Sequence, residues 1–106
     1  SGTSSIFRAH FRDYARSMMD WVSSKHALVV DVGSNDGTLL SSFADLGCEI
    51  QGVDPAQVLA EQASANGIPT LPNFFDDEAR DWILANRGMA DVVTVLFKDF
   101  LRRSEN

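Results

Sequence analysis

The residues best suited to ligand chemistry form a short acidic segment that contains two glycines, Asp31-Val32-Gly33-Ser34-Asn35-Asp36-Gly37. It ends an apolar run typical of a strand covered on both faces of a parallel sheet. Gly33 and Gly37 let the backbone approach a ligand closely, and Asn tolerates a left-handed conformation best among non-glycine residues. Ligands of open parallel sheets bind beyond the carboxyl ends of the strands, where the strand order reverses. The segment is therefore a candidate binding site. The alternative is a plain strand-to-helix turn capped by Asp36.

A second carboxylate, Asp54, ends the next expected strand, about 20 residues after Gly33. At that spacing a carboxylate can accept both hydroxyls of an adenosine ribose. Asp54-Pro55 is also a strong helix start, because Asp accepts orphan N–H bonds and Pro at the first helical position loses none. Both interpretations of Asp54 stay open when it is taken alone. Together with the glycine segment, it favours a nucleoside cofactor.

The composition of the loop discriminates between nucleoside cofactors. The dinucleotide fingerprint is G-x-G-x-x-G, and Asn35 stands where its middle glycine would be. Asp36 would repel a pyrophosphate, whereas it would attract the sulfonium and ammonium groups of S-adenosylmethionine. We therefore expect S-adenosylmethionine, and an NAD-linked oxidoreductase remains an alternative. A phosphoacceptor receiver domain would need an Asp after the third strand, where Leu71-Pro72-Asn73 stands.

The elements that must position these residues alternate between strand-like and helix-like segments. We expect helices over 5–23, 38–46, 54–66 and about 76–87, and strands over 27–32, 48–53, 68–71 and 90–97. This order predicts an α/β fold: a Rossmann-like, three-layer parallel sheet of about four strands with right-handed crossovers and an N-terminal helix. The chain is expected to be one partial domain, with the helix within 1–26, a βαβαβαβ half over 27–97 and a tail over 98–106.

Composition excludes several classes of function. The chain has 106 residues, a formal net charge of −6 and 44% hydrophobic residues, which is typical of one globular domain. An acidic body argues against nucleic acid as a partner. No apolar run approaches the roughly 20 residues of a membrane span. The single Cys48 permits no internal disulfide, and with His10 and His26 at unrelated spacings it predicts no metal site. The chain is expected to be cytoplasmic.

Two apolar features predict self-association. A sheet that ends at its fourth strand leaves an edge that can pair with another chain. One face of the first predicted helix carries a stripe of large apolar residues, which would pack onto the sheet or onto a partner. These are Phe7, Phe11, Tyr14, Met18 and Trp21. A homodimer through the sheet edge or through this helix is therefore a hypothesis.

The motifs together resemble a known family. The run from Val29 to Leu40, followed by Gly52-Val53-Asp54-Pro55, resembles the first two motifs of S-adenosylmethionine-dependent methyltransferases that C-methylate nucleotide-linked keto-deoxysugars. Three later segments continue the likeness in order, and the opening residues resemble the family segment before the first helix of the domain. The later segments are Asn66-Gly67-Ile68-Pro69-Thr70, Asn73-Phe74-Phe75 and Ala90-Asp91-Val92-Val93-Thr94, and the opening one is Ser1-Gly2-Thr3-Ser4-Ser5. The likeness ends at about Val95.

The resemblance implies a truncated class I methyltransferase core, and it implies which residues bind each part of the cofactor. Asp31, Gly33, Asn35 and Gly37 would line the methionine end of the cofactor, Asp54 would hold the ribose, and residues 73–75 would lie near the adenine. The full predicted cofactor-binding set is Asp31, Gly33, Ser34, Asn35, Asp36, Gly37, Asp54, Pro55, Asn73, Phe74 and Phe75. Phe74 and Phe75 could equally belong to the core.

The predicted function is cofactor binding within a C-methyltransferase that converts S-adenosylmethionine to S-adenosylhomocysteine. The chain alone is not expected to be catalytically complete, because no general base is identified. His10 has a suitable ordinary pKa, yet no partner stands at a readable spacing. The alternative function is a non-enzymatic Rossmann-like fragment that self-associates through its open sheet edge.

Overall fold

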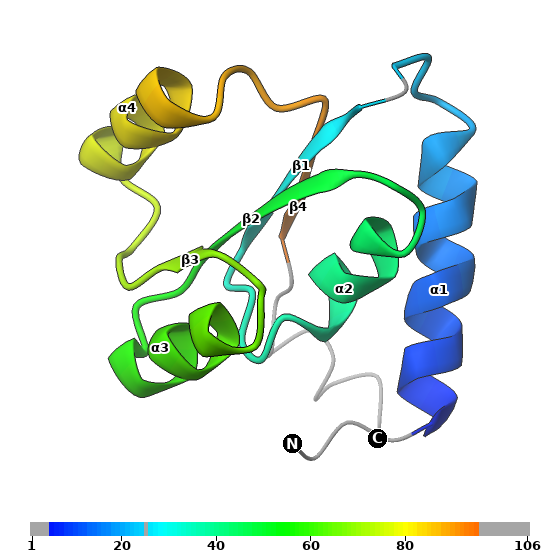
Figure 1. Cartoon of the computed structure of the whole chain (residues 1–106), viewed down its shortest axis with the longest axis horizontal. Helices are drawn as coiled ribbons and strands as arrows, with labels where there is room; N and C mark the ends of the chain where they lie inside the picture. Colours follow the sequence, from blue (N-terminus) through cyan, green and yellow to red (C-terminus); the bar gives the residue numbers. More distant parts are fainter. Residues whose placement is uncertain (1–4, 25, 96–106) are drawn as a thin grey trace.

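Four parallel strands form the centre of the computed structural model, which describes residues 5–24 and 26–95 (Figure 1). The strands lie in the order β3-β2-β1-β4, so the order reverses at β1. Their bounds are β1 Leu28–Val32, β2 Glu49–Val53, β3 Thr70–Leu71 and β4 Val92–Val95. Because every pairing is parallel, the predicted α/β, Rossmann-like fold is confirmed.

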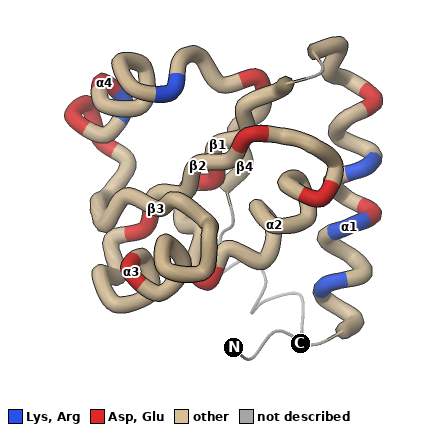
Figure 2. Tube along the Cα trace, in the orientation of Figure 1, with Lys and Arg blue, Asp and Glu red and all other residues tan. Residues whose placement is uncertain are grey.

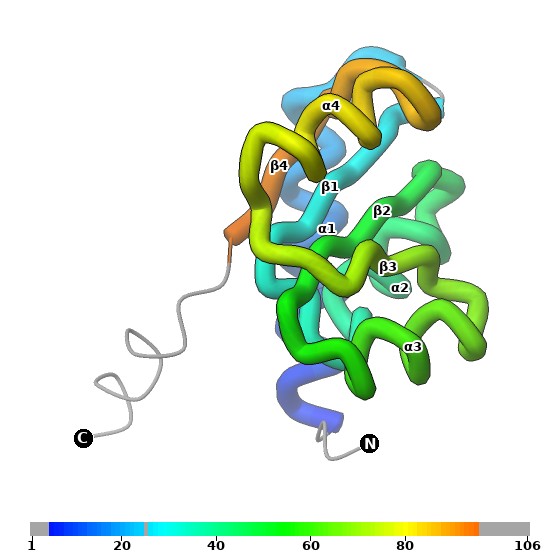
Figure 3. The backbone as a smooth tube through the Cα atoms, turned by 90° about the vertical axis from the view of Figure 1, so that its left-hand side faces the viewer, coloured from blue at the N-terminus to red at the C-terminus, as the bar shows by residue number. Residues whose placement is uncertain are grey.

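Helices cover both faces of the sheet and complete three layers. Their bounds are α1 Ser5–Met19, α2 Thr38–Ala44, α3 Gln57–Ala65 and α4 Asp77–Asn86. In Figure 1, α4 lies on one side of the strands, and α1, α2 and α3 lie on the other. The view turned by 90° agrees, with α4 in front of the strands and α1 behind them (Figure 3).

Side-chain alternation along the strands divides the core into two clusters. On one face, Leu40 and Phe43 of α2 pack with Val29 of β1, and Ala15 of α1 belongs to the same cluster. On the other face, Ile83 of α4 packs with residues of β1 and β2 that include Val30 and Val53. Continuous apolar strands are required because both faces of the sheet are covered. The carboxyl end of β1 is thereby held in a buried setting.

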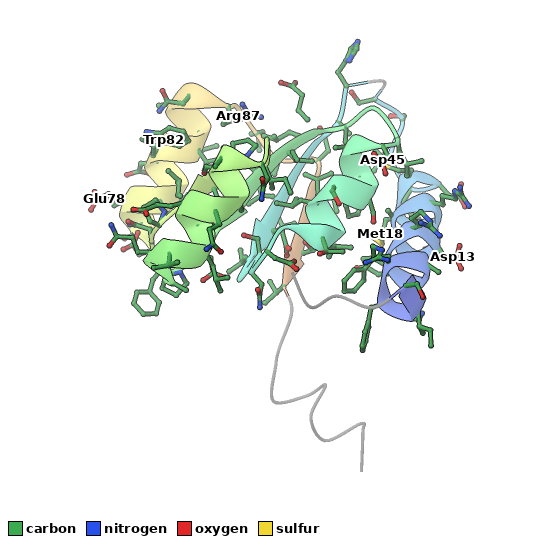
Figure 4. The ribbon with its side chains drawn as sticks, turned by 60° about the horizontal axis from the view of Figure 1, so that its bottom comes forward. Asp13, Met18, Asp45, Glu78, Trp82 and Arg87 are labelled. Atoms are coloured by element: carbon green, nitrogen blue, oxygen red, sulfur yellow. The ribbon has the colours of Figure 1, made fainter. Side chains whose placement is uncertain are left out.

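A side chain near the end of α4 fixes the helix to the sheet. Arg87, labelled in Figure 4, donates from Nη2 to the backbone oxygen of Ile50 in β2 at 3.0 Å. At the other end, Asp76 caps α4 by accepting the N–H of Ala79 at 2.9 Å, as its position before an acidic first turn indicates. The first contact fixes the end of α4 to β2, and the second stabilises the start of α4 where the chain arrives from β3.

The apolar stripe predicted on the first helix is only partly buried. Phe11 and Met18 pack against the core, and Met18 is labelled in Figure 4. Phe7, Tyr14 and Trp21 are 47%, 42% and 87% exposed, and the helix ends before Trp21. The core therefore buries only part of the stripe, and packing on the sheet does not account for Phe7, Tyr14 and Trp21. The buried line of α1 centres on Ala15, which is fully buried, and this rotates the larger residues toward solvent.

Some expectations fall beyond the described residues. These are the opening residues 1–4, the end of the predicted fourth strand and the tail over 98–106. Within the described part, the basic residues are Arg8, Arg12 and Arg16 on α1 and two arginines in and after α4 (Figure 2). The described helices include none long and apolar enough to cross a membrane. The same residues hold no group of three His, Cys, Asp or Glu side chains that could bind a metal ion.

Candidate functional site

The segment after β1 is a tight left-handed loop that folds over the end of β2. Gly33 and Gly37 have φ angles of 76° and 83°, and Asn35 is the only described non-glycine residue with positive φ, at 56°. The N–H of Gly33 donates to the backbone oxygen of Val53 at 2.8 Å. The expectation that Asn35 adopts a left-handed conformation is confirmed. The loop lies at the reversal of strand order, where open parallel sheets bind ligands.

Glycine at position 37 is required by packing as well as by its φ angle. A Cβ placed there would lie 2.7 Å from Cδ1 and 2.8 Å from Cγ2 of Ile68, the residue that leads from α3 toward β3. Ile68 is partly buried against the core cluster that contains Leu40 and Phe43. The loop is therefore pressed against the α3–β3 connection, which limits its conformations.

Asp54 joins the end of β2 directly to this loop. Its Oδ2 accepts the N–H of Asn35 at 2.8 Å, and its Oδ1 accepts the N–H of Ala56 at 2.9 Å. The residue is buried, with 6% of its surface exposed. The two strand ends that the sequence singles out thus meet in space. Since a carboxylate offers about four lone-pair sites, each oxygen keeps capacity for one more donor.

The predicted helix start at Asp54-Pro55 is wrong by about two residues. The helix begins at Gln57, and Ala56 is its N-cap with no side-chain hydrogen bond. The carboxylate of Asp54 bonds the N–H of Ala56 instead of capping the first turn, so Pro55 lies before the helix. The interpretation of Asp54 as an N-cap alone is therefore excluded, because this carboxylate serves the loop after β1.

A buried pair of polar side chains links β1 to β4. Asp31 and Thr94 are partners in the parallel register, and the Thr94 hydroxyl donates to Oδ1 of Asp31 at 2.7 Å. They are 2% and 5% exposed. Burial raises the pKa of Asp31 from 3.8 to about 6, while the hydrogen bond from Thr94 lowers it and the charge of Asp54 raises it further. The loop thus begins at a carboxylate that is costly to keep ionised.

Asp36 has a local structural role. Its Oδ1 accepts the backbone N–H of Thr38 at 3.0 Å and the Thr38 hydroxyl at 2.7 Å. Asp36 therefore stabilises the turn into α2, but the N-cap of the helix is Gly37, so the expectation that Asp36 is the cap is wrong by one residue. Asn35 and Asp36 also line an open cavity of about 580 Å³ between α2 and α3, together with Thr38, Ser41, Leu59, Gln62, Ala63, Asn66 and Ile68.

Ser34 faces the sheet. Its Oγ is buried and has no hydrogen-bond partner among the described residues. It lies 2.5 Å from the position that a Cβ on Gly52 would take, so β2 needs glycine at this place. A second hydroxyl, Thr70 Oγ1, lies 2.9 Å from the same position. The sequence motif contains Gly52, but only the structure shows that it makes room for these two side chains.

The predicted adenine-side residues follow the carboxyl end of β3. The N–H of Asn73 donates to the backbone oxygen of Leu71 at 2.9 Å, which turns the chain after the strand. Phe74 and Phe75 are 73% and 45% exposed, so the alternative that both are core residues is wrong. Phe75 lines a small, mainly apolar cavity of about 90 Å³ with residues that include Val30 and Ile83.

Thr94 is the residue of this site that reasoning from sequence did not select. It could have been found from the alternation of β4, because Thr94 shares a face with the buried Val92 and is the one polar side chain in Val92–Val95. The two histidines are both exposed. His10 is exposed on α1, and His26 is exposed before the amino end of β1, at the opposite edge of the sheet.

Comparisons with known proteins give two likenesses. No family model matches the chain. Over 66 residues, which are 62% of the chain, the sequence is 41% identical to C-methyltransferase NovU of Streptomyces niveus. The fold is similar to that of the plantazolicin methyltransferase BpumL, solved in complex with SAH, with a TM-score of 0.55 and 14% sequence identity over 93% of this chain. The predicted resemblance to C-methyltransferases is confirmed over the matched residues, and the fold is that of a methyltransferase.

The chain matches only part of each of these two proteins, and this limits what the similarities show. The matched region spans 16% of NovU, and the structural match covers 40% of BpumL. At 14% identity the likeness to BpumL concerns the fold alone. The activity and substrate of the whole protein are therefore matters for proposal.

Proposed function

We propose that this chain is the S-adenosylmethionine-binding portion of a C-methyltransferase that acts on a nucleotide-linked keto-deoxysugar or a similar small molecule. The contact between Asp54 Oδ2 and the N–H of Asn35 carries the proposal. The contact places a carboxylate that could accept the ribose hydroxyls next to the loop with positive φ angles. This loop lies at the reversal of strand order, where a nucleoside would bind. The identity to NovU, named a C-methyltransferase, supports the reaction class.

The charges and hydrogen-bonding capacity at this edge suit the cofactor. Asp31 and Asp54 are buried carboxylates at the ends of neighbouring strands, and a cationic ligand would compensate their charge. Asp54 retains acceptor sites for the two ribose hydroxyls, while its bonds to backbone N–H groups hold the carboxylate in place. When bound, S-adenosylmethionine supplies an electrophilic methyl group.

In this proposal the residues of this chain bind and orient the cofactor. None of them is assigned a role in proton transfer. Methylation of a carbon next to a ketone requires removal of a proton from that carbon before the carbon attacks the methyl group. Of the two histidines, His26 is exposed before the amino end of β1, at the edge of the sheet opposite the loop, and His10 is exposed on α1. We therefore assign cofactor binding to this chain.

Calorimetric titration with S-adenosylhomocysteine tests this proposal. We expect binding to wild type and at least about 100-fold weaker binding to Asp54→Ala, because charge-assisted hydrogen bonds to both ribose hydroxyls are lost. Asp54→Asn keeps one acceptor oxygen and should fall between them, and Asp45→Ala, at an exposed position after α2, is the matched control. Circular dichroism of each variant checks folding. No heat from wild type at millimolar ligand would reject the proposal.

Self-association is the second candidate function, and exposed apolar side chains on β4 favour it. Val93 and Val95 are 55% and 49% exposed on the strand at one end of the described sheet. Size-exclusion chromatography with light scattering should then show a dimer whose fraction rises with concentration. Val93→Lys, on an edge strand, should shift the protein to monomer. A wild-type monomer at all concentrations would eliminate this candidate.

A further inference from the structure

The hydrogen bond between Thr94 and Asp31 deserves a functional explanation because of its location. Both side chains are buried, and they belong to β4 and β1, the two strands on either side of the order reversal. Their register pairing makes the contact a fixed part of the sheet and independent of loop conformation. Thr94 is outside the set of residues predicted to bind the cofactor, so it needs a separate account.

One of the two carboxylate oxygens of Asp31 accepts a side-chain hydrogen bond within the described residues. Its Oδ1 accepts the Thr94 hydroxyl. Its Oδ2 is not among the fully enclosed side-chain oxygens without a partner in the described residues, where Ser34 Oγ is the one such atom, so Oδ2 remains accessible to a ligand. An ionised carboxylate on a buried residue is costly unless a donor or a cation stabilises its charge. The charged side chain that acts on Asp31 is Asp54, directly after β2, which has the same sign and gives no compensation. A cationic ligand at the end of β1 would provide it.

We propose that Thr94 is a positioning residue: its hydroxyl engages Oδ1 and so turns Oδ2 of Asp31 toward the ammonium group at the amino-acid end of the cofactor. This inference rests on the proposed function and adds to it a residue from β4. Thr94 acts through Asp31 and touches no reacting atom. The requirement is for a hydroxyl donor on a strand-compatible side chain, so serine should satisfy it and valine, which has the same shape without the donor, should not.

The test combines binding and titration measurements on three variants of the chain. Thr94→Val removes the donor, and Thr94→Ser keeps it. Thr70→Val is the matched control, since Thr70 is also a buried threonine on this sheet and donates to the backbone oxygen of Ile68. Affinity for S-adenosylhomocysteine is measured by calorimetry from pH 5 to 8. The pKa of Asp31 is measured from its carboxyl ¹³C shift without ligand.

We expect the loss of the donor to change both readouts. Thr94→Val should bind about tenfold more weakly at pH 7, because the hydrogen bond to a charged group is lost. Its binding should also require a higher pH, because the bond from Thr94 lowers the pKa of Asp31. Thr94→Ser should restore both properties to near the wild-type values, and Thr70→Val should leave them unchanged.

The outcomes separate this inference from the proposed function. If wild type binds and the Thr94→Val profile coincides with it, with the same Asp31 titration, Thr94 is merely structural and the inference is overturned. If all variants, wild type included, bind nothing between pH 5 and 8, the proposed function fails and the positioning role fails with it. Loss of binding in both Thr94→Val and Thr70→Val would assign the effect to general disruption of the sheet and would also overturn the inference.

Discussion

Gly37→Ala is expected to destabilise the chain by about 2 to 4 kcal/mol. Two costs add at this position. The φ angle of 83° is strained for any L side chain, and the new Cβ would meet Cδ1 and Cγ2 of Ile68 at 2.7 and 2.8 Å. Urea denaturation followed by circular dichroism measures the change in the free energy of unfolding. The effect is a large part of the stability of so small a domain.

The chain offers a control that separates the two costs. Gly47 has a φ of 90°, and a Cβ there meets nothing within 4 Å, so Gly47→Ala reports backbone strain alone, about 1 kcal/mol. The difference between the two variants measures the contact with Ile68. Adding Ile68→Val, which removes Cδ1, to Gly37→Ala should recover part of the loss. Equal losses for Gly37→Ala and Gly47→Ala would show that Ile68 moves aside and that the loop is not pressed against it.

Local sequence was sufficient to predict the elements and the loop. The apolar run at 27–32 is typical of a strand covered on both faces of a parallel sheet, and β1 occupies Leu28–Val32 within it. A left-handed bend needs residues such as Gly33 and Asn35, and both adopt positive φ. Asp54 was expected at the carboxyl end of the second strand, and it lies directly after β2.

Two kinds of feature could not be predicted from local sequence. One is the register between strands, and the other is which of several available hydrogen-bond partners a side chain takes. The Asp31 to Thr94 bond joins residues 63 positions apart and requires the exact pairing of β1 with β4. Asp54 could cap a helix or serve the loop, and its local sequence does not show that the N–H of Asn35 is within reach. The apolar stripe fits one face of a helix, yet burial on α1 is decided by where α2 lies, and this selects Ala15 over Tyr14.

Asp31→Asn is expected to make the protein more stable at neutral pH and poorer at binding. The folded-state pKa of Asp31 is raised to about 6 from 3.8, mainly by burial, so the native state binds its proton more tightly than the unfolded state does. The stability of wild type therefore falls as pH rises from about 4 to 6, and above pH 6 the penalty reaches about 2 to 3 kcal/mol. Asparagine carries no charge, so the variant should lack this loss.

The expected result is that the two stability curves coincide at low pH and diverge as the pH rises. Below pH 4 wild type and Asp31→Asn should be similar, and at pH 7 the variant should unfold at higher urea, by up to about 2 to 3 kcal/mol. Asp45→Asn makes the same chemical change at an exposed position and should show no such divergence from wild type. Affinity for S-adenosylhomocysteine should fall in Asp31→Asn, because the ammonium group loses its counter-charge. A gain in stability with a loss of binding would mean that the carboxylate is kept for the ligand at the expense of the fold. If the variant is instead less stable at pH 7, the ionised Asp31 supports the sheet itself, and the case for a cation at the end of β1 is lost.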